Sequence, residues 1–350
     1  MEARGAPATE GGVWNQRVGG FTAVPAIIRQ LGADPISIFR DVGLAPGCFD
    51  TPEQRIPYAA MGALFQEAAR RTGCAHFGLL CGRVWHLSDL GMVGDLLRNS
   101  PTVGRALQTL TVYQHINSEG GLAFLLRRDS VVDLGYAIYH PAVTGAPEIY
   151  DTLMAGGCNF LRELCGVGWT PSEVFFPHSR PLDLNPYQRF FRASLRFDSE
   201  FCALRFPLHW LDRPVPGADP ERLRIADREA RAAGHGQLLE QVSRALRVLL
   251  LHGKSSGNDV AQMLAMHRRT LNRRLKAQGV TFQLVLDEVR FEVAQQLLAD
   301  TQVAIDDVSA ALGYASVSPF MRSFQRWSGT TPGRWRHTAQ KRRPVVSQAR

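Results

Sequence analysis

The C-terminal quarter of the chain repeats one helical pattern, and this repeat limits the possible folds more than any other feature. The stretch "VAQMLAMHRRTLNRRL" (260–275) is matched by "VSAALGYASVSPFMRSF" (308–324) about 48 residues later. In each copy a short helix with an apolar i, i+4 pair is followed by a turn and a second helix. This order is typical of the helix-turn-helix motif. The sequence therefore predicts two such motifs, at 258–277 and 305–327.

The second helix of each motif is predicted to have a polar, basic side opposite an apolar side. On a helix of about 100° per residue, Leu271 and Leu275 share one side of the first copy, as Phe320 and Phe324 do in the second. Arginine and asparagine carry the forked donors that match guanine and adenine edges in the major groove. A solvated charged surface is the alternative, but the same arrangement occurs twice. The polar sides carry Arg268, Arg269, Asn272, Arg273 and Lys276 in the first copy and Ser318, Arg322, Gln325 and Arg326 in the second.

The basic charge of the chain is concentrated in the same quarter. Residues 258–350 hold 14 Lys and Arg against 7 Asp and Glu, whereas the whole chain holds 40 against 32, a net charge of +8. This asymmetry indicates a module that binds a polyanion, joined to a nearly neutral module. We therefore expect double-stranded DNA to be a partner of the C-terminal quarter.

A long helix with an apolar stripe is predicted between the two motifs, at 281–300. At about 1.5 Å per residue it spans roughly 30 Å, close to the ~34 Å between successive major-groove faces on one side of a duplex. The two DNA-reading helices are thus predicted to enter adjacent major grooves.

Residues 237–337 resemble the DNA-binding domain of the AraC/XylS-type transcription regulators. The resemblance rests on "VAQMLAMHRRTLNRRLKAQGVTF" and "VSAALGYASVSPFMRSFQRWSGTTPGRWR", whose "GTTPGRWR" is similar to that family's G-x-[ST]-P-x-x-[YWF]-R ending. Ala265 stands where a turn glycine is usual, and His267 where an N-cap serine is usual; neither departure removes a DNA-reading residue. The resemblance implies base contacts from Arg269, Asn272 and Arg273, with further contacts near Ser316, Val317, Ser318 and Arg322.

The N-terminal two thirds predict an α+β domain, in contrast to the all-α C-terminal domain. Helical patterns alternate with short strands such as "GLAFLLRR" and "VVDLGYAIYH", which predict a hairpin around Asp129 and Ser130. The region resembles the N-terminal effector domain of ornithine- and arginine-utilisation-type regulators, notably in "LGMVGDLLRNSPTVGRALQTLTVY". The expected organisation is a disordered tail at 1–20, an effector-binding and dimerisation domain at 21–210, a linker at 211–236, the DNA-binding domain at 237–337, and a basic tail at 338–350.

Polar side chains that could line an effector pocket cluster in two segments of this half, at Tyr113, His115, Tyr136, Tyr139 and His140. For any one of them, an ordinary core or surface position is the alternative. Cys74, His76, Cys81 and His86 lie close in sequence, but their spacing matches no common zinc site, so packing is the better interpretation. No catalytic or phosphate-binding motif occurs, and we expect no cofactor, no metal and no catalytic residues. The six cysteines are expected to be reduced thiols.

These patterns favour a sequence-specific, effector-responsive transcription regulator that binds DNA, recruits or blocks RNA polymerase, and forms a possible homodimer. Two alternatives stay open: a constitutive DNA-binding protein with a degenerate sensor domain, and an enzyme with a DNA-binding appendage. The start "MEARGAPATEGG" is no signal peptide, and no apolar run is long enough for a membrane span, so we expect a cytoplasmic protein. The effector, the operator and the direction of regulation do not follow from the sequence.

Overall fold

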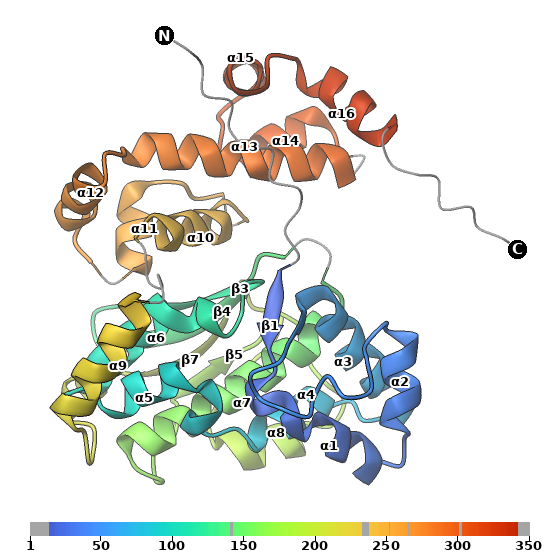
Figure 1. Cartoon of the computed structure of the whole chain (residues 1–350), viewed down its shortest axis with the longest axis vertical. Helices are drawn as coiled ribbons and strands as arrows, with labels where there is room; N and C mark the ends of the chain where they lie inside the picture. The colour runs from blue at the N-terminus through green and yellow to red at the C-terminus, as the bar shows by residue number, and fades with distance from the viewer. Residues whose placement is uncertain are drawn as a thin grey trace, which may run out of the picture. The chain divides into compact units, whose positions relative to one another are not determined.

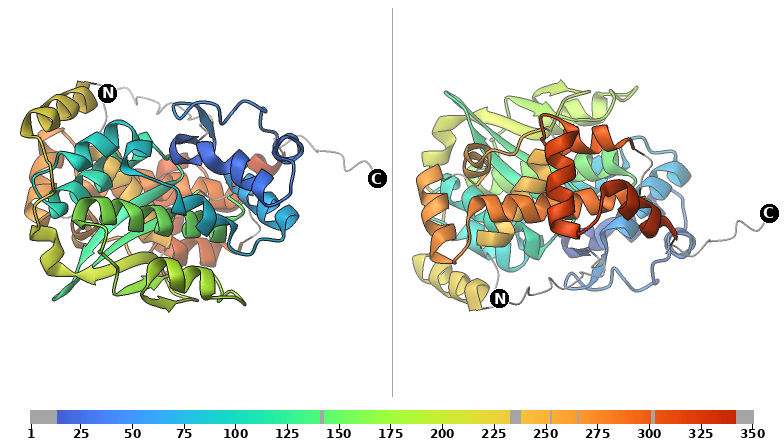
Figure 2. Two further views of the ribbon diagram at one scale, coloured as in Figure 1. Left: turned by 90° about the horizontal axis from the view of Figure 1, so that it is seen from below. Right: turned by 90° about the horizontal axis from the view of Figure 1, so that it is seen from above.

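The computed structural model describes residues 14–140, 143–232, 238–251, 253–264, 266–300 and 303–341. The chain divides into two compact units, Met1–His235 and Gly236–Arg350 (Figures 1 and 2). The first is α+β and the second is all-α, which confirms the predicted fold class. None of the helices in the described ranges is long and apolar enough to cross a membrane.

The N-terminal unit is built on a sheet that, within the described residues, has five strands in the order β3-β4-β7-β5-β6 (Figure 1). Only β5 and β6 pair in parallel, and the other neighbours are antiparallel. The hairpin predicted around Asp129 and Ser130 is confirmed as β3 and β4, which pair from Gly121 with Ile138 to Arg127 with Val132. The strand bounds are β3 Gly121–Arg127, β4 Val131–Ile138, β5 Glu173–Phe175, β6 Ser194–Arg196 and β7 Cys202–Pro207.

Helix α7 (Ala146–Cys165) packs against β4 and β7 of the sheet on one side and against α4 (Phe77–Arg83) on the other. Glycines allow α4 to lie very close to α7. A Cβ at Gly78 would lie 2.1 Å from the carbonyl oxygen of Glu148, so any larger residue would push the helices apart. The remaining helical elements of the unit are η1 Gly19–Ala23, α1 Val24–Gln30, α2 Pro35–Asp41, α3 Tyr58–Thr72, η2 Leu87–Leu90, α5 Met92–Arg98, α6 Val103–Tyr113, η3 Gln114–Ile116, α8 Asn185–Phe191, η4 Leu208–Asp212 and α9 Pro220–Ala232.

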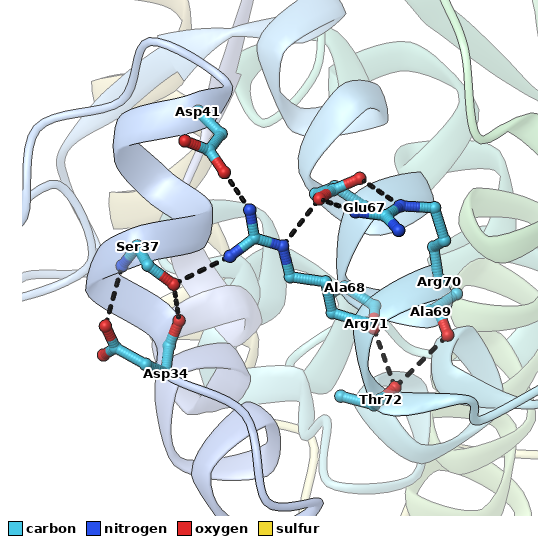
Figure 3. Close-up of polar contacts among 9 residues, drawn as sticks. All are labelled: Asp34, Ser37, Asp41, Glu67, Ala68, Ala69, Arg70, Arg71 and Thr72. Atoms are coloured by element: carbon cyan, nitrogen blue, oxygen red, sulfur yellow. Dashed lines mark hydrogen bonds and ion pairs between the residues drawn. The ribbon is translucent and has the colours of Figure 1, made fainter.

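Polar contacts join α2 to α3 at the surface of this unit (Figure 3). The guanidinium of Arg71 donates to Glu67 Oε1 at 2.7 Å and to Ser37 Oγ at 2.8 Å, and it also pairs with Asp41. Asp34 caps the start of α2 by accepting from the backbone N–H of Ile36 and Ser37. Hydrogen bonds and charge from the neighbouring arginines lower the pKa of Glu67 to about 2.

The prediction of a disordered tail at 1–20 is wrong for the last residues of that range. Strand β1 (Asn15–Arg17) pairs antiparallel with β2 (Arg55–Pro57), and Val18 is fully buried beside it. The polar composition of the segment concealed a three-residue strand, which is too short for a period-2 pattern to reveal. Residues 1–13 lie outside the described residues.

The predicted linker at 211–236 is also largely structured. Leu211 and Val215 are buried in the N-terminal core, and α9 packs on α5 through Ala226 and Ala230. The helix "PERLRIADREARA" is so rich in charged residues that its narrow apolar face did not predict a helix packed on the core. The structured part of the N-terminal unit thus continues to Ala232, and residues 233–237 lie outside the described residues.

The C-terminal unit is arranged around the long helix α13 (Phe282–Asp300), which contacts α10, α14 and α16 (Figures 1 and 2). The predicted motifs are formed by α11 with α12 and by α14 with α15. The second motif packs on α13 through Val308, Leu312, Phe320 and Phe324, which are all fully buried. The prediction of a basic tail at 338–350 is wrong for its first residues, because α16 continues to Lys341, and residues 342–350 lie outside the described residues. The other bounds are α10 Leu238–Leu251, α11 Gly257–Met263, α12 Arg268–Ala277, α14 Ile305–Ala311, α15 Val317–Ser328 and α16 Pro332–Lys341.

Candidate nucleic-acid interface

Helix α12 presents one side to solvent because its apolar stripe is anchored in the core. Leu271 and Leu275 are fully buried, as the spacing predicted. The exposed arc of α12 is defined here as four predicted residues that the structure brings together on the open side: Arg269, Asn272, Arg273 and Lys276. Among the described residues, none of these four side chains has a hydrogen bond or ion pair. Their donors are therefore available to an external acceptor.

Arg268 does not belong to this exposed arc, contrary to the prediction. Its guanidinium carbon lies 4.4 Å from the ring centroid of Phe282, at the start of α13. The same group covers Gly257 at the start of α11, where a Cβ would lie 0.6 Å from Arg268 Nη1. The geometric reason is that Arg268 precedes Leu275 by seven residues, which places the two about 20° apart around the helix. Arg268 joins the first motif to α13.

The entry into α12 lacks a side-chain cap. His267 occupies the N-cap position in an extended conformation, and its side chain accepts no capping hydrogen bond. Its substitution for the usual serine therefore leaves the first-turn N–H groups open to another acceptor. Ala265, the other departure from the family pattern, lies outside the described residues. The preceding helix α11 is conventionally capped, with Ser256 Oγ accepting from the backbone N–H of Asp259 at 3.2 Å.

Helix α15 of the second motif has a similar division between buried and open sides. Ser318 and Arg322 are exposed, and Val317 is half-buried at the first turn. Ser316 occupies the N-cap position and is exposed, but it makes no side-chain cap bond. Arg326 differs from the prediction, because it forms a 3.0 Å ion pair with Asp287 of α13. One arginine of this helix thus joins it to α13, and the other projects outward.

Sequence reasoning missed the buried arginine that joins the two motifs. Arg290 of α13 donates to the carbonyl oxygens of Leu312 and Gly313 at 2.9 and 3.3 Å, and to Ser255 Oγ at 3.2 Å. Its guanidinium also lies 4.4 Å from the ring centroid of Tyr314. The only available sequence signal was an arginine beside the apolar stripe of a long helix. Arg290 fixes the turn of the second motif relative to the loop before the first.

The effector-pocket residues predicted in the N-terminal unit do not converge on one site. Tyr113 donates to Asp227 of α9 at 3.1 Å, and His115 Nδ1 lies 3.0 Å from the carbonyl oxygen of Val112. The rings of Tyr139 and His140 pack edge-on against Trp14, and burial lowers the pKa of His140. Of the five, Tyr136 alone lines the cavity described next.

A cavity of about 90 Å³ lies between the sheet, α7, the end of α6 and the segment from β1 to η1. Tyr136 contributes its hydroxyl group, which lies 3.0 Å from Ser118 Oγ. Burial raises the pKa of Tyr136, so the phenol stays neutral. Most of the lining was missed because it comes from segments far apart in sequence, including the supposed tail.

The histidines and cysteines between Cys74 and His86, which lie close in sequence, do not form a metal centre. Among the described residues, no three His, Cys, Asp or Glu side chains are grouped so as to hold a metal ion. All six cysteines are described and free, and burial raises the pKa of both Cys74 and Cys81. These thiols are therefore protonated packing groups in this structure.

Comparison with known proteins identifies both units. A family model described as "Arabinose-binding domain of AraC transcription regulator, N-term" matches residues 32–215, and one described as "Helix-turn-helix domain" matches 260–338. The HTH-type transcriptional regulator VirS of Mycobacterium tuberculosis is 28% identical, over 89% of this chain and 93% of that protein. The ornithine utilization regulator of Pseudomonas aeruginosa is 26% identical over the same shares of the two chains. The crystal structure of the regulator CdpR from Pseudomonas aeruginosa is 23% identical, with a TM-score of 0.42 over 89% of this chain and 98% of that one.

The first family model covers more than half of the chain, and the second covers all but the first residues of the two helix-turn-helix motifs. The architecture agrees with this assignment, because an α+β unit precedes an all-α unit that contains the two motifs. The protein belongs to the AraC family of DNA-binding transcription regulators, with an N-terminal effector-binding domain.

Proposed function

We propose that the chain regulates transcription by placing α12 and α15 in adjacent major grooves of one DNA site. The observation that carries this proposal is the exposed arc of α12, whose four donor side chains stand opposite the buried Leu271 and Leu275. Asn272 and Arg273 have the donor geometry to read adenine and guanine edges, respectively. Arg269 and Lys276 flank them and are suited to phosphate oxygens. Ser318 and Arg322 of α15 contact the second groove.

The length of α13 supports contact with two grooves. Its 19 residues span about 28 Å, which approaches the ~34 Å repeat of the major groove on one side of B-form DNA. Arg290 and Arg326 hold α13 to the second motif, and Arg268 holds it to the first. These contacts favour a fixed spacing between the two reading helices.

The N-terminal unit is proposed to bind a small-molecule effector and to mediate homodimerisation. Its cavity supports this role over a constitutive DNA-binding protein with a degenerate sensor, because it offers space for a small molecule between the sheet and α7. The regulated partner is RNA polymerase, recruited or blocked at the promoter, and the site of action is the cytoplasm. The chain acts as a regulator and not as an enzyme with a DNA-binding appendage.

Binding to matched operator sequences tests the assignment of the exposed arc. Chromatin mapping gives the cognate site, and competition with single-base variants measures discrimination by the full-length protein. Asn272→Ala and Arg273→Ala are each expected to remove about 1–3 kcal/mol of discrimination at one base pair. Arg274→Ala is the matched control, since Arg274 is exposed on the same helix but lies about 100° of rotation from Arg273. Equal losses on cognate and random DNA for all three variants would refute base reading by α12.

A further inference from the structure

The wall of the cavity in the N-terminal unit is mostly apolar, and polar residues that include Arg17, Gln114 and Tyr136 interrupt it. Side chains from the sheet, α6, α7 and η1 surround it, including Phe21, Leu110, Leu134, Met154, Phe160 and Leu204. A single water needs roughly 10–15 Å³ when volume is measured in this way, so about 90 Å³ accommodates a small organic molecule. A wall of this composition favours a ligand that is mostly apolar.

Gln114 places an acceptor in this wall without a partner in the protein. Its Nε2 donates at 3.4 Å to the carbonyl oxygen of Ser118 and to Tyr136 Oη. Because a carbonyl oxygen can only accept, the contact with Ser118 fixes which end of the amide is the nitrogen. The opposite atom, Oε1, is buried and has no hydrogen-bond partner among the described residues. The residue as a whole is 8% exposed.

Trp85 supplies a hydrogen-bond donor that likewise has no partner in the protein. Its indole Nε1 is buried and lacks a hydrogen-bond partner in the described part of the chain, and the residue is 5% exposed. The ring is held by Phe21 and Phe160, whose centroids lie 4.8 and 6.1 Å from it. Gly20, which also lines the cavity, packs closely against the edge of the indole ring, because a Cβ there would lie 2.5 Å from Nε1. Buried polar atoms without partners are uncommon, and two in one cavity indicate an absent partner.

The two charged residues of the wall, Arg17 and Asp89, already have partners within the protein. Arg17 lines the cavity, but its guanidinium pairs with Glu53 at 3.1 Å and donates to the Asp89 carbonyl at 2.6 Å and to Asn117 Oδ1 at 3.3 Å. The Asp89 carboxylate accepts from the backbone N–H of His86 at 2.8 Å. A carboxylate ligand would therefore compete with Glu53 for Arg17 and would repel the open acceptor Gln114 Oε1.

We propose that this cavity binds a small, uncharged, mostly apolar molecule whose single polar group both accepts and donates hydrogen bonds, as a primary amide does. The group accepts from Trp85 Nε1 and donates to Gln114 Oε1, while the apolar remainder contacts the wall. This inference deepens the proposed effector response by naming the site and the ligand class. Its binding test needs neither DNA nor a promoter.

Indole signals in the NMR spectrum of the full-length chain provide a direct test. The six tryptophans are labelled with ¹⁵N, and Trp85→Phe and Trp169→Phe assign two indole N–H signals. The probes are hexanamide, cyclohexanecarboxamide and benzamide, each paired with the corresponding carboxylate. At least one amide is expected to shift the Trp85 signal in a saturable way, and its carboxylate is expected to bind at least tenfold more weakly. The Trp169 signal is an internal control, because its Nε1 is likewise buried without a hydrogen-bond partner among the described residues, but Trp169 does not line the cavity.

Gln114→Met removes the acceptor while keeping the side-chain length. It is expected to weaken the amide about tenfold, the effect of losing one net hydrogen bond, and the change is read at the Trp85 signal. Amides that leave the Trp85 signal unmoved, carboxylates that bind more tightly than amides, or an unchanged affinity in Gln114→Met would each overturn the proposal. Promoter output, measured separately with the same probes, distinguishes a failure of the proposed ligand site from a failure of the proposed effector response. Binding without a transcriptional response contradicts the effector role and leaves the ligand site intact.

Discussion

Arg290 donates a 2.9 Å hydrogen bond to the carbonyl oxygen of Leu312, the residue that ends the first helix of the second motif. The same guanidinium reaches Ser255 Oγ, in the loop before the first motif. Arg290 is 9% exposed, so these bonds form in a largely desolvated setting, where a lost partner is costly. One side chain thus couples both DNA-binding motifs to the helix between them.

Arg290→Met is expected to destabilise the C-terminal unit by about 2–3 kcal/mol, because it leaves buried oxygen atoms without donors while keeping apolar bulk. The change is measured by chemical denaturation of the full-length protein, from the midpoint of the transition in which the C-terminal unit unfolds. Arg274→Met serves as the control at an exposed position, with an expected effect within about 0.5 kcal/mol. Identical midpoints for the two variants would show that Arg290 has no such coupling role.

The salt dependence of DNA binding is expected to separate Arg269 from Arg268. Each neutralised phosphate contributes about −0.9 to the slope of log K against log salt concentration. Arg269→Met is expected to make this slope shallower by about 0.9, since its exposed guanidinium can contact a phosphate. Arg268→Met is expected to leave the slope unchanged and to lower stability, because Arg268 stacks on Phe282. A shallower slope in Arg268→Met would mean that this side chain leaves Phe282 when DNA binds.

The sequence predicted the C-terminal unit better than the N-terminal unit for a physical reason. In the helix-turn-helix motifs, local periodicity determines the buried stripe, so Leu271, Leu275, Phe320 and Phe324 could be predicted from their spacing. Periodicity did not reveal Arg268 and Arg290, because their contacts depend on neighbouring helices. The cavity of the N-terminal unit depends on residues as distant in sequence as Trp85, Gln114 and Leu204, and no local pattern joins them. The predicted pocket therefore shared only Tyr136 with it.

Stability of the N-terminal unit is expected to fall as the pH rises above neutrality because of His178. Its Nε2 lies 3.0 Å from Asp151 Oδ1, and Tyr187 donates to the other oxygen of that buried carboxylate. Burial alone lowers the pKa of His178, but the hydrogen bond and charge of Asp151 outweigh burial and raise it. A raised histidine pKa gives stability that is fully present below about pH 6.5 and is lost as the pH rises through the folded-state pKa.

Thermal denaturation between pH 5.5 and 8.5 measures this dependence. His178→Gln should flatten the alkaline decline, whereas the exposed His209→Gln should leave it as in the unmodified chain. An unchanged pH profile in His178→Gln would assign the decline to another group.

The N-terminal unit is expected to require α9, a helix that sequence reasoning placed in a linker. Ala230 is fully buried and Ala226 is 8% exposed, and Asp227 accepts a 3.1 Å hydrogen bond from Tyr113. A fragment of residues 1–235 keeps these contacts, whereas a fragment of residues 1–215 loses them and exposes the face of α5 that α9 covers. The shorter fragment should be less stable by at least about 2 kcal/mol in chemical denaturation.

Two substitutions in the full-length chain test the same contact without truncation. Ala230→Glu forces a carboxylate into the buried face of α9 and should lower the midpoint of the N-terminal transition, because an unpaired buried charge is strongly unfavourable. Arg228→Glu changes charge at an exposed position of the same helix and should have little effect. If the two fragments are equally stable and Ala230→Glu leaves the midpoint of the N-terminal transition unchanged, then α9 does not stabilise the N-terminal unit and is part of a linker. Loss of stability in both tests would place the boundary of the effector-binding unit after α9, so that ligand screens require a fragment that includes it.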